Sequence, residues 1–115
     1  MLRGEVRLTD LEPVRCSEAN KRRPAVIVSN DRANATADRL GRGMVTVVPV
    51  TSNVMRVFPF QTLLSAELTG LRVDSKAQAE QVRSLTVERI GPVLGRVPPQ
   101  VMAELDEALR VHLQL

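Results

Sequence analysis

The chain has 115 residues, of which 43% are apolar and 25% are charged, so we expect one water-soluble folded domain over residues 1–115 and exclude a disordered chain. Only two residues are aromatic, which excludes RNA-binding modules that stack bases on aromatic platforms, and a net charge of +3 favours anionic partners without proving one. With one cysteine, one histidine and no apolar signal or membrane segment, the sequence predicts neither a disulfide nor a zinc site and favours the cytoplasm.

The first third of the chain predicts two strands and a helix. Residues 4–9 alternate polar and apolar side chains, as a strand with one wet face does. Pro24 suits the first residue of a strand because it has no N–H, and the apolar run 25–28 is typical of a strand buried on both faces. Residues 30–31 then offer N-caps for a short helix that Gly41 closes.

The middle of the chain predicts two more strands joined by a loop. Residues 43–53 are rich in Val and Thr, with Pro49 marking a bulge or a sheet edge. The next strand is expected at 57–66. The segment 51–56 between them opens with three polar residues and ends on a cation, which indicates an exposed loop.

The segment 77–85 fits two structures. Its composition favours a helix, whereas its alternation favours a strand. We expect a strand, preceded by a turn region over 69–76. Residues 91–97 predict one more short strand.

The C-terminal segment predicts an amphipathic helix. Pro98 and Pro99 suit a helix start. After them, side chains that could form one face recur at spacings of three and four, at Val101, Leu105, Ala108, Leu109 and His112. About six short strands with this helix predict an α+β domain, mostly β, arranged as a small and mostly antiparallel barrel.

An ordered series of segments is more specific than any one motif in the chain. The series is RGEV and TDLEP near the start, SEANKRRPAVIVSNDRAN in the middle, and then VVPVTSN, VFPF and DSKAQAEQVRSL. Over residues 2–113, this series resembles the MazF/PemK family of toxin endoribonucleases from bacterial type II toxin-antitoxin systems.

The resemblance implies a fold, an activity and partners. The fold is the MazF/CcdB/Kid-like toxin fold, a small SH3-like antiparallel barrel with a short internal helix and a C-terminal helix. The activity is sequence-specific cleavage of single-stranded RNA by attack of the RNA's own 2′-OH, without metal or other cofactor. The partners are a second copy in a homodimer and a MazE-like antitoxin that wraps the dimer and blocks the RNA groove.

The resemblance also assigns catalytic residues. The family's pair of an Arg before Pro and a Thr after the VPV strand maps onto Arg23 and Thr51. A guanidinium presents forked donors to charge that builds on phosphate oxygens, and a hydroxyl can orient one of them. Because Arg stays protonated, Glu18 is the candidate for assisting the base step. The single histidine, His112, excludes a pair of catalytic imidazoles.

Several polar residues around this pair are candidates for RNA binding. Most of them have a plain alternative: surface charge for the cations, ordinary loop polarity for residues 52–56, and a structural hydrogen bond or salt bridge for 81–83. Alternation along a strand would turn the last two toward one surface. The candidates are Ser17, Asn20, Lys21, Arg22, Ser52, Asn53, Arg56, Gln81 and Arg83.

Two other functions compete with RNA cleavage. Toxins of the same fold poison DNA gyrase without catalysis, but they share a Trp-bearing C-terminus and this chain has no Trp. A non-catalytic relative is the other alternative, and it predicts the loss of Arg23 or Thr51, both of which are present. Two departures from the family pattern, Arg7 in the first strand and Cys16 in the loop that follows, leave the dimer packing and loop mobility open.

Overall fold

The computed structural model describes residues 1–11 and 22–115. Within these residues the chain forms seven strands, three α-helices and two short 3₁₀ turns. The strands are β1 (Glu5–Asp10), β2 (Arg22–Ile27), β3 (Met44–Thr51), β4 (Gln61–Leu64), β5 (Ser75–Gln78), β6 (Arg83–Thr86) and β7 (Ile90–Arg96). The helices are α1 (Asp31–Leu40), α2 (Ala66–Thr69) and α3 (Pro99–Leu113), and the turns are η1 (Ala79–Gln81) and η2 (Val87–Arg89).

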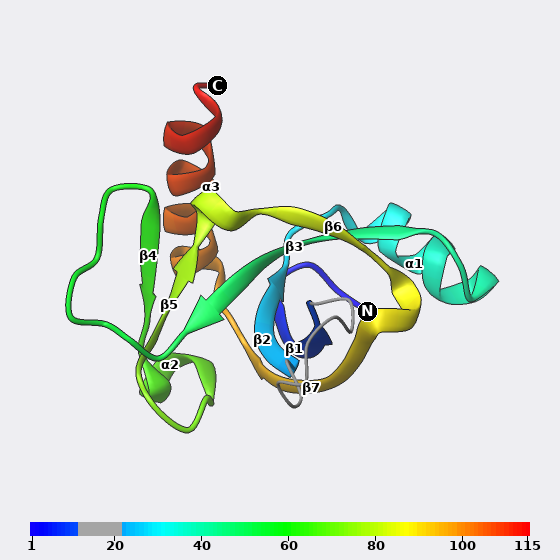
Figure 1. Cartoon of the computed structure of the whole chain (residues 1–115), viewed down its shortest axis with the longest axis horizontal. Helices are drawn as coiled ribbons and strands as arrows, with labels where there is room; N and C mark the ends of the chain where they lie inside the picture. The colour runs from blue at the N-terminus through cyan, green and yellow to red at the C-terminus, as the bar shows by residue number, and fades with distance from the viewer. Residues whose placement is uncertain (12–21) are drawn as a thin grey trace, which may run out of the picture.

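The strands form one antiparallel sheet centred on β3. The order is β4-β5-β3-β2-β1-β7, and β6 pairs with β3 beside β5. The strands curve around a common centre (Figure 1), but within the described residues no ladder joins β4 to β7, so the barrel is not closed. The expected mostly β, antiparallel fold with helices is therefore confirmed, with an open rather than closed barrel.

The sheet separates two apolar cores, and β2 contributes to both. Val26 packs into the core beneath α3, while Ala25 and Ile27 point to the opposite core beneath α1. All three side chains are fully buried. This is the two-sided burial that the apolar run predicts, and it makes β2 a rigid support for the residues at its start.

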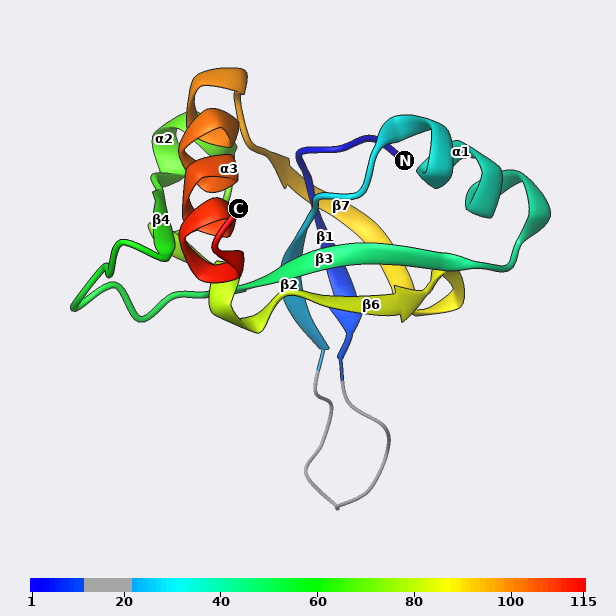
Figure 2. The same ribbon diagram turned by 90° about the horizontal axis from the view of Figure 1, so that it is seen from above.

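The two longer helices cover opposite ends of the sheet (Figure 2). The Asn30 side chain caps α1 by accepting the Ala33 N–H at 2.8 Å, and Gly41 ends the helix with a φ of 68°. Pro99 starts α3 as expected. The buried face of α3 consists of Val101, Met102, Leu105 and Ala108, whereas His112 is exposed in its last turn. Within the described residues, no helix is long and apolar enough to cross a bilayer.

The strand expected at 57–66 is shorter than predicted. Only Gln61–Leu64 are paired, and α2 follows at once because the Ser65 side chain caps it. Before β4, the Gln61 side chain accepts the Phe58 N–H at 3.2 Å, which holds the preceding residues in a loop. Hydrogen bonds from the backbone to side chains thus replace strand pairing at both ends of the expected segment.

The single strand expected at 77–85 is two strands, β5 and β6, separated by η1. The cause is the register of β3: its first half pairs with β6, its end pairs with β5, and the pairing shifts between them. Between β5 and β6, residues 79–81 pair with neither part of β3 and form the 3₁₀ turn η1. Pro49 lies where β3 exchanges β6 for β5, so the irregularity predicted there is present, but β3 is central rather than at an edge.

Candidate active site

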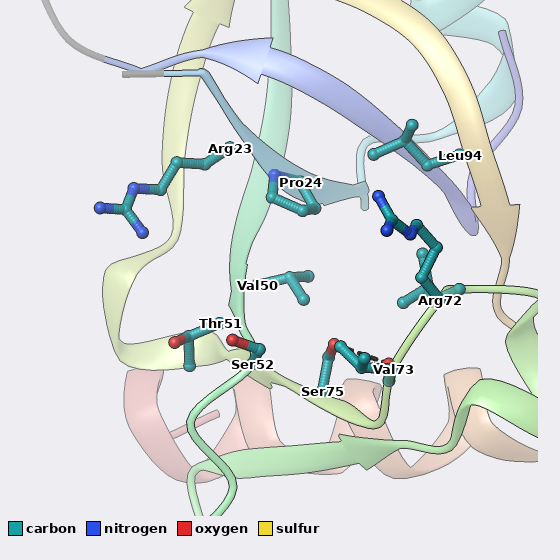
Figure 3. A pocket seen from close by; sticks show the side chains of 10 residues that line it. Arg23, Pro24, Val50, Thr51, Ser52, Arg72, Val73, Ser75 and Leu94 are labelled. Carbon is teal, nitrogen blue, oxygen red and sulfur yellow. Dashed lines mark hydrogen bonds between the residues drawn. The ribbon is translucent and has the colours of Figure 1, made fainter. Parts of the chain in front are cut away.

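Arg23 and Thr51 lie together at neighbouring ends of β2 and β3. The two strands pair antiparallel through Ala25 and Pro49, so two further residues along each strand lead to Arg23 and Thr51. Both residues line the same two cavities. Figure 3 draws one of these cavities and shows Arg23 and Thr51 on the same side of it. The structure thus brings together two residues that are 28 positions apart in the sequence.

The backbone of Arg23 is held firmly while its side chain is exposed. Thr9 is opposite Arg23 in β1, is 1% exposed, and donates its hydroxyl proton to the Arg23 carbonyl at 2.9 Å. Among the described residues, no carboxylate pairs with the Arg23 guanidinium. The site therefore offers a fixed cation with free donors, which is the arrangement an anion requires.

Thr51 is half-buried at the last position of β3, opposite Lys76 in β5. Its hydroxyl oxygen accepts the Asn53 N–H at 3.2 Å, and the Asn53 side chain in turn accepts the Met55 N–H at 3.2 Å. These bonds fix the oxygen and leave the hydroxyl proton to be donated. Thr51 can therefore donate a hydrogen bond to an anion bound at Arg23.

Two cavities flank this pair, and we name them by their linings. The polar cavity has a volume of about 330 Å³ and is lined by Leu11, Arg23, Pro49, Val50, Thr51, Gln78, Gln81 and Arg83. The apolar cavity has a volume of about 280 Å³ and is lined by Arg23, Pro24, Val50, Thr51, Ser52, Leu71, Arg72, Val73, Ser75 and Leu94 (Figure 3). Because Arg23, Val50 and Thr51 line both, the pair forms the border between the cavities.

The other candidate residues differ in where they lie relative to these cavities. Gln81 and Arg83 both line the polar cavity, but they come from η1 and β6 and not from the single strand that was expected. Ser52 lines the apolar cavity. Arg22 is exposed at the start of β2, opposite Asp10.

Asn53 and Arg56 belong to the loop between β3 and β4. The buried Lys76 binds this loop, and we call it the loop clamp. Lys76 is 8% exposed and donates from Nζ to the Arg56 carbonyl at 2.6 Å. The same ammonium lies 5.9 Å from the centroid of the Phe58 ring, and the Arg56 guanidinium lies 5.5 Å from it. Phe58 stacks on Phe60 with ring centroids 5.3 Å apart. The loop therefore has a defined path next to Thr51.

Four candidates fall in residues 12–21, outside the described residues, namely Ser17, Glu18, Asn20 and Lys21. Leu11, which precedes that segment, lines the polar cavity, and Arg22 follows it at the start of β2. The two described residues that flank this segment in the sequence therefore lie at or next to the site.

Sequence reasoning missed four site residues: Arg72 and Ser75 beside the apolar cavity, Gln78 beside the polar cavity, and the loop clamp Lys76. The alternation from Lys76 to Gln78 was a usable signal, because it places both on the face that Thr51 shares. No local pattern marks Arg72, whose position depends on the packing of its loop against β7.

The fold is that of solved toxin structures. MazF from Deinococcus radiodurans is 28% identical with a TM-score of 0.78, and the match covers 100% of this chain and 97% of that one. An endoribonuclease in complex with its cognate antitoxin, from Mycobacterial species, is 25% identical with a TM-score of 0.77 over 100% and 96% of the two chains. The open antiparallel sheet and its helices therefore define a toxin of the MazF structural class.

Sequence comparison gives the family. A family model described as "PemK-like, MazF-like toxin of type II toxin-antitoxin system" matches residues 2–113. Endoribonuclease MazF9 of Mycobacterium tuberculosis is 64% identical over 100% of this chain and 98% of the relative. Endoribonuclease EndoA of Bacillus subtilis is 28% identical over 98% of this chain and 94% of the relative. The chain belongs to the PemK-like, MazF-like family of type II toxins.

Proposed function

We propose that this toxin is a sequence-specific endoribonuclease that cleaves single-stranded RNA without a metal and that a cognate antitoxin neutralises it. The 64% identity to a protein named an endoribonuclease, over the whole chain, supports the activity. The solved complex of a similar endoribonuclease with its antitoxin supports the partner. We also propose that the protein acts as a homodimer in the cytoplasm, where its RNA substrate is.

The observation that carries the mechanism is that Arg23, whose guanidinium pairs with no carboxylate among the described residues, lines the same two cavities as Thr51. A ribose 2′-oxygen attacks the adjacent phosphorus and forms a new O–P bond as its proton departs. The bond from phosphorus to the 5′-oxygen then breaks, and that oxygen takes up a proton. Arg23 stabilises the charge on the phosphate oxygens, and Thr51 donates to one of them.

Proton transfer requires a group other than Arg23, because a guanidinium does not give up its proton in proteins. Within the described residues, no carboxylate lines either cavity. We therefore assign the assisting base to Glu18, which lies in the sequence between Leu11, a residue of the polar cavity, and Arg22 at the start of β2. Glu18→Gln removes the base without changing the shape of the side chain, so we expect slower cleavage with binding retained.

The remaining candidates hold the RNA strand. Gln81 and Arg83 face the polar cavity and are suited to a base edge or phosphate, and Ser52 offers a hydroxyl beside Thr51. Arg22 adds an exposed charge at the same end of β2. We assign phosphate or base contacts also to Ser17, Asn20, Lys21, Asn53 and Arg56.

Gyrase binding by a toxin of the same fold is not favoured. Two relatives that match nearly the whole chain are named endoribonucleases, and the chain lacks the Trp-bearing C-terminus of the gyrase-binding toxins.

The test is cleavage of a long single-stranded RNA in EDTA, with the ends mapped. We expect wild type to cut at a recurring short sequence, and Arg23→Ala to be slower by roughly 100- to 1,000-fold, the usual loss when one charge-stabilising donor is removed. Thr51→Val should lose activity while Thr51→Ser, which keeps the hydroxyl, retains it. Arg39→Met removes an exposed charge on α1, away from the site, and controls for net charge.

Circular dichroism must show that each variant is folded. Full activity of folded Arg23→Ala would refute the mechanism, and a wild type that makes no cuts would refute the function.

A further inference from the structure

The apolar cavity is walled by aliphatic side chains from four separate parts of the chain. Pro24 and Val50 form its inner side, and Leu71, Val73 and Leu94 complete it (Figure 3). Val73 is 55% exposed and Leu94 is 39% exposed, although both are apolar. A cavity of about 280 Å³ is close to the smallest pockets that enclose an organic ligand, roughly 300 Å³.

The wall next to β7 depends on a close contact of two backbones. A Cβ atom at Gly95 would lie 2.5 Å from the Thr69 carbonyl oxygen and 3.2 Å from the Leu71 side chain. Glycine thus lets the segment after α2 pack directly on β7, which brings Leu71, Arg72 and Val73 alongside Leu94. The cavity is built by the packing of the fold.

Polar side chains also line this apolar cavity. Arg72 lies across the cavity from Arg23, with its guanidinium directed toward the cavity (Figure 3). Among the described residues, no carboxylate pairs with Arg72. The Ser75 hydroxyl donates to the Val73 carbonyl at 3.1 Å, so its oxygen remains an acceptor. The exposed Arg72 thus presents donors at the rim, and the buried Ser75 presents an acceptor in the wall.

We propose that the apolar cavity holds one nucleobase next to the scissile phosphate and that Arg72 determines which base is accepted. The inference rests on the proposed function. A nucleobase has two apolar faces and a polar edge, which matches aliphatic walls with a polar rim. Cations on opposite sides of the cavity fit the strand that carries the base, since that strand has a phosphate on each side of every nucleotide.

The division of roles follows from the chemistry of the lining. Aliphatic walls contact the face of any base and do not distinguish one from another. Discrimination therefore falls on hydrogen bonds to the base edge, for which Arg72 supplies two or more donors in a fixed fork. Arg72 is thus a specificity-determining residue, whereas Arg23 serves the cleavage step.

The test combines substrate and protein changes. In an oligonucleotide that wild type cuts at one site, each nucleotide flanking the cut is replaced in turn by an abasic sugar, and kcat/KM is measured for wild type, Arg72→Met and the control Arg39→Met. At one flanking nucleotide we expect base removal to slow wild type by roughly 10- to 100-fold. Arg72→Met should be slow on the intact substrate by a similar factor and insensitive to base removal at that nucleotide. Arg39→Met should behave as wild type.

The mapped sequences give a second readout, because Arg72→Met should relax the preference at that one nucleotide only. The proposal fails if neither abasic substitution slows wild type, or if the effects of Arg72→Met and base removal multiply independently. It also fails if Arg72→Met changes only the protein concentration at which the dimer dissociates, since a second copy would then occupy the cavity. A wild type that cuts nothing removes the proposed function and this inference with it, whereas cutting that ignores Arg72 overturns this inference alone.

Discussion

Lys76→Met should loosen the loop between β3 and β4 without unfolding the protein. Methionine keeps most of the apolar stem of Lys76 but loses the 2.6 Å bond to the Arg56 carbonyl and the contact with the Phe58 ring. A hydrogen bond to a charged group contributes about 1.5–3 kcal/mol, and a cation over a ring adds about 0.5–1 kcal/mol. Relief from burying the ammonium offsets part of this loss, because Lys76 is only 8% exposed.

A net local loss of about 2 kcal/mol corresponds to about 30-fold lower protection from hydrogen exchange. The amides to follow are Met55 and Phe58, whose N–H groups are bonded to the side chains of Asn53 and Gln61. The internal control is the Asn34 amide in α1, which bonds to the Asn30 carbonyl at 3.0 Å. Unchanged protection at Met55 and Phe58 would refute the clamp, and an equal loss at Asn34 would show that Lys76 supports the whole fold instead.

Two further predictions follow from burial and charge. Leu105→Ala should lower the free energy of unfolding by about 2–5 kcal/mol, because Leu105 is fully buried in the α3 core. Leu113→Ala, on the exposed end of the same helix, should lower it by less than about 1 kcal/mol. Equal urea midpoints for the two variants would contradict the assigned core. Arg83→Met should reduce the slope of log kcat/KM against log salt by about 0.7 if Arg83 contacts one phosphate of a single strand; a slope equal to that of wild type and Arg39→Met would exclude that contact.

The sequence predicted elements whose signals are local. Pro24 followed by three buried apolar residues identifies β2, and Asn30 with Gly41 brackets α1 almost to the residue, since a cap and a left-handed glycine each act within one turn. The break between β5 and β6 was not predictable in this way. It depends on where β3 changes partners, which no property of residues 77–85 records.

The candidate site shows the same contrast between residues that the sequence identifies and residues whose place depends on the fold. Arg23 and Thr51 were named through the family resemblance, and the structure places them together at paired strand ends. Lys76 and Arg72 were missed. A lysine in sequence suggests exposure, yet Lys76 is buried by the Phe58 ring and the loop it binds. Arg72 reaches the site only because Gly95 lets its loop pack on β7.

The placement of the site on β3 has an evolutionary consequence. Arg23 and Thr51, the proposed catalytic pair, extend from strands that both cores share, so we expect substitutions in β2 or β3 to harm folding and chemistry together and to be removed by selection. About half of the residues that line the two cavities come instead from residues 71–75 and 78–83 and from β7, on segments that carry fewer buried side chains. Duplicated copies of such a gene can therefore diverge in the RNA sequences they cut while every copy retains the same cleavage reaction.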